Sequence, residues 1–309
     1  MANNSSVAGI RDNTSLLCGK DPAYYTNTIG IVVDWVIFLV GLPEVSLACY
    51  ALLCLLKKDR VAPIFTINLL LSDLIQILIT VVFIVSRFFD ATFYPFVRAR
   101  CVARLFVHLG MISSLGFMLL ISAERYVMVG RPVWYHTKNR TKLAILISIC
   151  MWILSVVYST LDYVFMIHTR FSSLMFSIIC LLPGPFLLGL LIATWRAISK
   201  SMAMRHEIRN RRRVLGVLSL VFGTYTVLFL PFSFRTLYYS IKGDNASEAE
   251  TSVRDLCNVL TTALVYLSPL IDSLIYIFIR RDTGEAFTCC KMRLTKLKVF
   301  QERLTDTSR

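Results

Sequence analysis

The chain has 309 residues, of which 56% are hydrophobic and 17% are charged, and its mean hydropathy is +0.65. Soluble domains are roughly 45–50% apolar and about 25% charged, and 19 acidic residues are too few to cover the two soluble domains expected at this length. The low acidic count excludes a soluble protein, the high hydrophobic fraction excludes a disordered one, and 13 glycines are too few for a collagen-like one. A polytopic membrane protein with a net charge of +14 remains.

Seven apolar stretches are long enough to cross a membrane as helices, since a bilayer core of about 30 Å needs about 20 residues. In chain order they are 29–56, 62–86, 103–129, 143–166, 173–195, 214–240 and 257–279. We therefore expect an all-α membrane protein with three parts. These are an extracellular tail (1–28), a seven-transmembrane helix bundle (29–279), and a short cytoplasmic amphipathic helix with a C-terminal tail (280–309).

Basic residues concentrate in alternate loops and predict the orientation of the bundle. These basic segments are 57–60, 131–142, 196–213 and 280–309. The N-terminus is therefore expected outside the plasma membrane, and the inner basic segments are expected to contact lipid headgroups. Four N-x-S/T sequons on the outer side predict glycosylation at Asn3, Asn4, Asn13 and Asn245.

A few ionisable residues and prolines interrupt the spans, where charged groups are costly and usually functional. In chain order the notable ones are Asp73, the run Glu124-Arg125-Tyr126, Pro132, Pro231 and Asp272. A lone aspartate is also compatible with a satisfied interhelical hydrogen bond, and a lone proline with a simple kink. Their order and depth along the chain make the combination specific.

This combination resembles the rhodopsin-like G-protein-coupled receptors over essentially the whole chain. NLLLSD resembles the second-helix motif of that family, and ERY with Pro132 resembles its D/E-R-Y motif and inner-loop proline. Further matches are Trp152 in the fourth helix, Phe229 and Pro231 in the sixth, and Asp272-Ser273-Leu274-Ile275-Tyr276 in the seventh. The pattern looks most like the branch of nucleotide, proton-sensing and lysolipid receptors.

The resemblance implies a receptor that binds an outside ligand and promotes nucleotide exchange on a heterotrimeric G protein. It also implies arrestin and a receptor kinase as partners, and no binding of nucleic acid. The implied switch residues are Glu124, Arg125, Tyr126, Pro132, Phe229, Pro231 and Tyr276. Because a proline kinks a helix, Pro231 would let a small outer shift move the inner end of the sixth helix. The sequence has no HExxH, GxSxG or CxxC motif, so catalysis is not expected.

Asp73 and Asp272 are expected near the bilayer midplane on facing helices, where the family binds a sodium ion. Ser114 and Ser268 fall at matching positions. Two adjacent carboxylates do not both ionise cheaply without a cation or a shared proton. We therefore expect a Na⁺ or proton site coupled to activation, with a neutral hydrogen-bonded cluster as the alternative. No other cofactor is expected.

An excess of arginine marks the outer side of the bundle. The residues are Arg87, Arg98, Arg100, Arg104, Arg170, Arg235 and Arg254. Arg104 and Arg235 are the strongest ligand-binding candidates, with His108 third, because arginine can bind phosphate or carboxylate through two bonds. Binding of lipid phosphates is the alternative. An anionic ligand such as a nucleotide, fatty acid or lysolipid is predicted, and an amine is disfavoured because the outer third span holds no acid.

Two groups of cysteines have predicted roles. Cys101 matches the family's third-helix disulfide cysteine, although the outer segment 167–172 offers no partner. Cys18 and Cys257 resemble a pair that bridges the tail to the seventh helix in the nucleotide-receptor branch, so the partner of Cys101 stays open. Cys289 and Cys290 follow the amphipathic stretch and suit palmitoylation.

Three departures from the family pattern keep other functions open. Val45 stands where the first-helix asparagine is expected, Ser273 replaces the seventh-helix proline, and the fifth helix lacks its usual tyrosine. A receptor-like scaffold or decoy that no longer couples is therefore an alternative. An ion channel or transporter is a further one.

Overall fold

The structure is a computed structural model that describes residues 28–56, 64–88, 94–130, 140–165, 169–200, 205–242 and 248–272. Within these ranges nearly every residue is helical and none lies in a strand. Residues 1–27 and the predicted amphipathic helix and tail over 280–309 lie outside the described residues.

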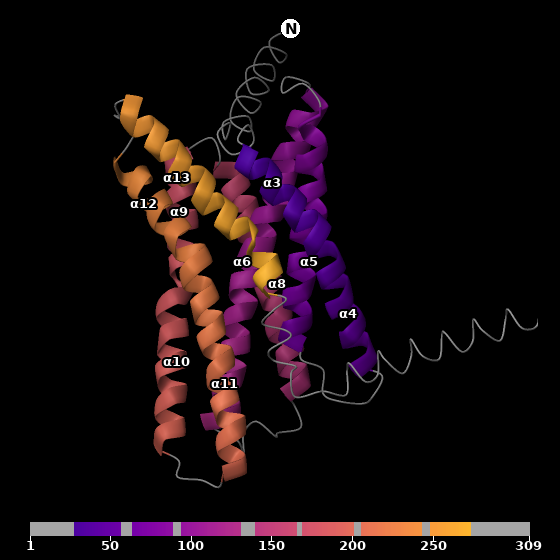
Figure 1. The fold of residues 1–309 in the computed structure, drawn as a ribbon, viewed down its shortest axis with the longest axis vertical. Coiled ribbons are helices and arrows are strands. Elements are labelled where there is room, and N and C mark those ends of the chain that lie inside the picture. The colour runs from indigo at the N-terminus through magenta and orange to yellow at the C-terminus, as the bar shows by residue number, and fades with distance from the viewer. Residues whose placement is uncertain are drawn as a thin grey trace, which may run out of the picture.

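Twelve helical segments make up the described chain (Figure 1). They are α3 (Thr28–Val36), the π-helical η1 (Ile37–Gly41), α4 (Leu42–Leu56), α5 (Ile64–Ser86), α6 (Tyr94–Gly130), α8 (Arg140–Val164), α9 (Thr169–Leu181), α10 (Pro183–Lys200), α11 (Arg205–Thr224), the π-helical η3 (Tyr225–Phe229), α12 (Leu230–Lys242) and α13 (Glu248–Tyr266).

These segments combine into the seven predicted helices. The first helix is α3 with η1 and α4, the fifth is α9 with α10, and the sixth is α11 with η3 and α12. Six of the seven are long and apolar enough to cross a membrane within the described residues. The seventh consists of α13 and, after a turn at Leu267, further helical residues as far as Asp272, the last described residue. The predicted all-α bundle is confirmed, although the third helix starts at Tyr94 rather than 103, because helical hydrogen bonding continues beyond the apolar stretch.

Prolines explain where the helices become irregular. η1 ends two residues before Pro43, and η3 ends two residues before Pro231. A proline has no backbone N–H, and a π-helical turn is one way in which the preceding backbone is rearranged. The fifth helix is interrupted at Leu182, directly before Pro183.

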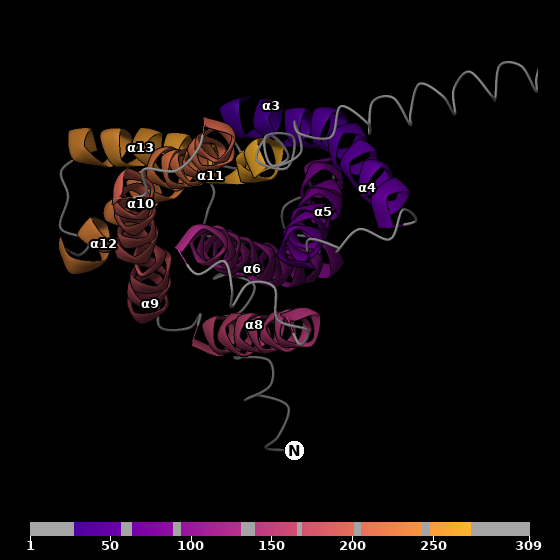
Figure 2. The same cartoon turned by 90° about the horizontal axis from the view of Figure 1, so that it is seen from below.

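The third helix occupies the interior of the bundle, and the fourth lies at its edge (Figure 2). α6 packs against α5, α8, α10 and α11. Of its most apolar stretch 67% is buried, compared with 17% for the fourth helix. The remaining apolar surface of α8, such as Leu146 and Leu154, is the lipid-facing side expected of a peripheral membrane helix.

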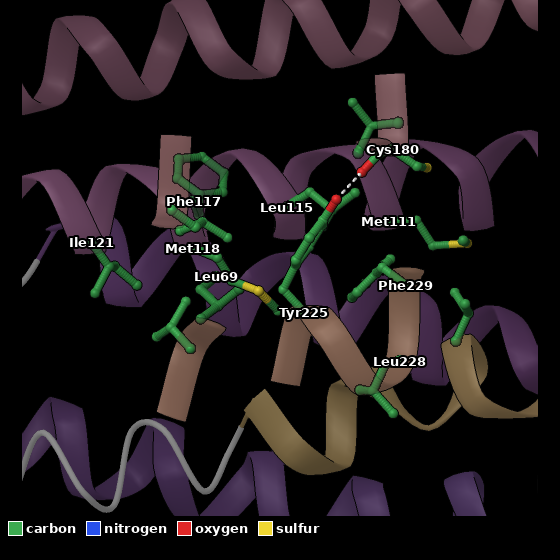
Figure 3. Packing of buried hydrophobic residues seen from close by; sticks show 14 of the residues in the cluster. Leu69, Met111, Leu115, Phe117, Met118, Ile121, Cys180, Tyr225, Leu228 and Phe229 are labelled. Atoms are coloured by element: carbon green, nitrogen blue, oxygen red, sulfur yellow. Dashed lines mark hydrogen bonds between the residues drawn. The ribbon is translucent and has the colours of Figure 1, made fainter. Parts of the chain in front are cut away.

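The main hydrophobic core forms where α6 meets the fifth and sixth helices. Figure 3 shows Met111, Leu115 and Met118 of α6 close to Tyr225 and Phe229 of η3. All five side chains are at most 2% exposed. The irregular turn η3 is therefore packed against the centre of the bundle, between its two ends.

Candidate functional site

A cavity of about 140 Å³ lies between the third, fourth, fifth, sixth and seventh helices. Its polar lining comprises Arg104, His108, Asp162, Ser172, Ser173, Arg235, Thr236, Asn258 and Thr262, and its other lining residues are Met111, Phe176, Phe232, Val265 and Tyr266. The three predicted ligand-binding residues, Arg104, His108 and Arg235, thus come together at one cavity from α6 and α12. Their role in binding stays a prediction.

On one side of the cavity, an acid from α8 fixes the histidine of α6. Nδ1 of His108 lies 2.6 Å from Oδ2 of Asp162, and the hydroxyl of Ser172 donates to Oδ1. The ring of His108 also stacks on Phe176, with centroids 4.6 Å apart. Because Asp162 already binds both a histidine and a hydroxyl, and also interacts electrostatically with Arg104, its charge is largely engaged within the protein.

On the opposite side, Arg235 is held by polar and aromatic neighbours. Its Nη1 donates to the side-chain oxygen of Asn258, and its Nη2 donates to Thr236 at 3.0 Å. The guanidinium also lies over the ring of Phe232, 5.0 Å from the centroid. Asn258 belongs to α13, so this arginine joins the sixth and seventh helices at the cavity wall.

The cavity combines two arginines and a histidine with a single carboxylate among its described lining residues. Because Asp162 is shared between His108, Ser172 and Arg104, the lining keeps an excess of positive charge. The prediction against an amine ligand considered only the third span and missed this acid, which comes from the fourth. Asp162 is, however, engaged by His108 and Ser172 and interacts with Arg104.

A second polar cluster is fully buried below the cavity, between α5, α6 and the seventh helix. Asp73, Ser114, Ser268 and Asp272 are each 0% exposed. The hydroxyl of Ser114 is 2.9 Å from Oδ2 of Asp272 and 3.4 Å from Oδ1 of Asp73. The structure therefore brings Asp73, Ser114 and Asp272 together, and Ser268 precedes Asp272 by about one helical turn.

This cluster does not satisfy its own hydrogen-bonding capacity. Oδ2 of Asp73, Oδ1 of Asp272 and the hydroxyl oxygen of Ser268 are buried and have no hydrogen-bond partner among the described residues. Buried polar atoms are nearly always paired, so an unpaired group indicates an ion, a water molecule or a shared proton. Carboxylate and hydroxyl oxygens are ligands that suit a hard cation such as Na⁺. The described residues contain no group of three or more His, Cys, Asp or Glu placed to hold a metal ion.

The switch residues of the third and sixth helices occupy different environments. Glu124, Arg125 and Tyr126 are half-buried near the end of α6, and Nε of Arg125 is buried and bonds to no residue within the described ranges. Phe229 is fully buried at the end of η3, and Pro231 follows in the first turn of α12. Two further switch residues, Pro132 and Tyr276, lie outside the described residues.

The cysteines correct one prediction. Cys101 is disulfide-bonded, whereas Cys180 and Cys257 are free thiols, so the predicted bridge between Cys18 and Cys257 is wrong. The resemblance carried this pairing over to Cys257, but that residue keeps its free thiol in the structure. The other predicted modification sites lie outside the described residues: Cys289, Cys290, Asn3, Asn4, Asn13 and Asn245.

The sequence reasoning also missed a buried ion pair between the first and second helices. Nη2 of Arg87 lies 2.5 Å from Oδ2 of Asp34, whose side chain is 2% exposed. From the sequence, Arg87 is one of the seven outer arginines and has no predicted partner. Asp34 could have been found, because it stands alone among apolar residues in the first predicted span.

Comparison with known proteins places the chain in a family. The sequence profile of the family described as "7 transmembrane receptor (rhodopsin family)" matches residues 46–276. Proteinase-activated receptor 2 of Rattus norvegicus is 24% identical, over 92% of this chain and 77% of its own length. Free fatty acid receptor 3 of Rattus norvegicus is 33% identical over 43% of this chain and 42% of its own length. Chemokine XC receptor 1 of Mus musculus is 25% identical over 53% of this chain and 50% of its own length.

Proposed function

The chain belongs to the rhodopsin family of seven-transmembrane receptors, and on that basis we propose that it binds an extracellular anionic ligand and promotes nucleotide exchange on a heterotrimeric G protein. In this proposal the receptor lies in the plasma membrane with its N-terminus outside. Arrestin and a receptor kinase would be further partners on the inner side.

The observation that supports an anionic ligand is the positive lining of the cavity. Arg104 and Arg235 come from different helices, and Arg235 is held in place by Asn258 and Phe232. An arginine fixed in this way loses little further freedom on binding, and its guanidinium can bind a carboxylate or phosphate through two parallel bonds. The name of free fatty acid receptor 3 describes a receptor for anionic ligands of this kind.

The aromatic lining offers a route from the ligand to the sixth helix. Phe176 of α9 packs edge-to-face on Phe232 of α12, with centroids 5.8 Å apart. Phe232 directly follows Pro231, at the junction with η3. A ligand that moves Phe176 or Arg235 therefore acts on the kinked part of the sixth helix, and the inner segment α11 would follow.

We further propose that the cluster of Asp73, Ser114, Ser268 and Asp272 holds a sodium ion that favours the inactive packing. The unpaired oxygens of the two aspartates and of Ser268 fit this ion. When bound, the ion supplies the positive charge that two neighbouring buried carboxylates lack. Ser114 would orient both carboxylates from the third helix.

A ligand screen on matched variants tests the proposed function. Cells expressing the wild-type receptor would be screened with anionic metabolites and lipids, and each active compound would be titrated on Arg104→Ala and Arg235→Ala receptors. We expect both variants to need at least tenfold more ligand, since bonds to charged groups contribute about 1.5–3 kcal/mol each. Arg254→Ala is the matched control, because Arg254 is also an outer arginine but does not line the cavity. Equal potency on all four receptors would refute the assigned anion site.

A further inference from the structure

A tyrosine hydroxyl connects the interruption of the fifth helix at Leu182 with the π-helical turn η3 of the sixth helix. Tyr225 begins η3, and its hydroxyl reaches Cys180 near the end of α9, just before the interruption at Leu182 (Figure 3). It donates to the backbone carbonyl of Cys180 at 3.0 Å, and the carbonyl oxygen of Leu181 lies 3.3 Å away. Tyr225 is 1% exposed and Cys180 is 0% exposed, so the bond is formed in the interior.

The interruption of the fifth helix creates the need for this hydroxyl. Pro185 lacks the backbone N–H that would otherwise bind the carbonyl of Leu181 within the helix. Inside a membrane, a backbone carbonyl without a partner is costly, and the missing partner must come from a neighbouring helix or side chain. Tyr225 supplies that partner from the sixth helix.

A glycine makes the close approach possible. A Cβ atom on Gly184 would lie 2.8 Å from the hydroxyl oxygen of Tyr225 and 2.9 Å from its Cε1, distances that side-chain carbons do not tolerate. The same helix contains Gly189, where a Cβ atom would meet nothing within 4 Å. Gly184 is therefore a specific requirement of the contact with Tyr225, whereas Gly189 is not.

The bond lies between the cavity and the inner half of the sixth helix. Cys180 follows Phe176, which lines the cavity, by one helical turn on α9. The ring of Tyr225 stacks on Phe229, with centroids 6.3 Å apart and planes at 13°. On the inner side, α11 packs against both α10 and α6. A movement that separates α11 from the fifth helix must therefore break or redirect the hydroxyl bond.

We propose that the Tyr225 hydroxyl is a latch that holds the inner half of the sixth helix against the fifth, and that a ligand in the cavity releases it by moving α9 or α12. The latch belongs to this chain's own packing, and its existence does not depend on the ligand's identity or on G-protein coupling. Releasing it takes the hydroxyl away from the carbonyls of Cys180 and Leu181, the second of which has no helical donor at Pro185, and this makes the separated arrangement the minor one without ligand.

A distance measurement on purified receptor in lipid nanodiscs tests the latch. A pair of dyes would be attached through unnatural amino acids at Ser199 of α10 and Gly216 of α11, which are both exposed. A Cβ atom at Gly216 meets nothing within 4 Å, so this label is tolerated. Tyr225→Phe keeps the stacked ring and removes only the hydroxyl. We expect the ratio of separated to closed receptors to rise about fivefold without ligand, the effect of losing one ordinary buried hydrogen bond.

Two matched pairs make the result specific. Tyr158→Phe removes a buried tyrosine hydroxyl that bonds to none of the described residues, so its distance distribution should equal that of the wild type. Gly184→Ala should shift the distribution in the same direction as Tyr225→Phe, and Gly189→Ala should not. If the Tyr225→Phe receptor does not reach the membrane, the comparison of Gly184→Ala with Gly189→Ala tests the latch in its place.

A wild-type distribution in Tyr225→Phe would overturn the latch, and so would equal distributions in the Gly184→Ala and Gly189→Ala receptors. Basal nucleotide exchange measured on the same samples separates the latch from the proposed function. A shift in distance without any exchange on a G protein would support the latch and contradict the proposed coupling.

Discussion

Two polar regions of the receptor can be compared: the cavity and the buried cluster of Asp73, Ser114, Ser268 and Asp272, which we call the midplane cluster. They satisfy their polar groups in opposite ways. In the cavity, His108 and Arg235 are paired with Asp162 and Asn258, which come from neighbouring helices. In the midplane cluster, within the part of the chain that the structure describes, two aspartates meet a single well-placed hydroxyl, that of Ser114, and three oxygens have no partner. The cavity is thus held together by its own residues, whereas the cluster leaves room for the sodium ion or shared proton that we propose.

This difference indicates a division of roles along the bundle. A preformed lining can select a ligand with little rearrangement, since its side chains are already ordered. A site whose charge balance depends on an exchangeable ion can change state when the surrounding helices move. The cavity therefore suits recognition, and the cluster suits the control of helix packing.

The largest loss of stability is expected when the ion pair between Asp34 and Arg87 is broken. Asp34→Asn removes a buried carboxylate that bonds directly to the guanidinium of Arg87, which we expect to lower the free energy of unfolding by about 3 kcal/mol. Thermal unfolding of purified receptor measures the loss. Asp255→Asn, at an exposed position on α13, serves as the control and should leave the unfolding temperature unchanged. An equally stable Asp34→Asn receptor would show that the pair is not essential to the outer bundle.

The opposite behaviour is expected of the midplane cluster, where an added ion should stabilise the receptor. A ligand that binds only the folded protein stabilises it by about 2.7 kcal/mol at one hundred times its Kd. Sodium should therefore raise the unfolding temperature and lower basal exchange in the wild type, and Asp73→Asn should abolish both responses. Potassium at the same ionic strength controls for general salt effects. An Asp73→Asn receptor that keeps the full sodium response would exclude the proposed ion site.

A smaller effect is expected where a cavity residue acts by positioning another. Asp162→Asn removes the charge that holds His108 but keeps the shape of the side chain. We expect ligand potency to fall by about tenfold, the loss of one charge-assisted hydrogen bond, with the maximal response retained. Dose–response curves at equal surface expression measure this change. A lower maximum at unchanged potency would instead assign Asp162 to activation.

The sequence predicted the bundle well because each span is defined by local composition. Asp73 and Asp272 were also found, since an isolated charge in an apolar span is conspicuous and the family motifs fix its depth. Asp162 was missed because it lies near the end of an apolar stretch, where a charge also marks the membrane boundary. The role of Tyr225 could not be read from sequence, because aromatic residues at helical spacing are usual in a core and its partner is a backbone carbonyl 45 residues away.

The central claim, that occupation of the cavity drives nucleotide exchange, is tested most directly by measuring GTP-analogue binding to purified heterotrimeric G proteins. Receptor in nanodiscs would be combined with each G-protein class, with and without an anionic agonist from the screen. We expect the receptor to accelerate exchange on at least one class, the agonist to increase the rate further, and Arg125→Ala to abolish both effects. Agonist binding without faster exchange on any class would contradict the account and identify the chain as a receptor-like scaffold that does not couple.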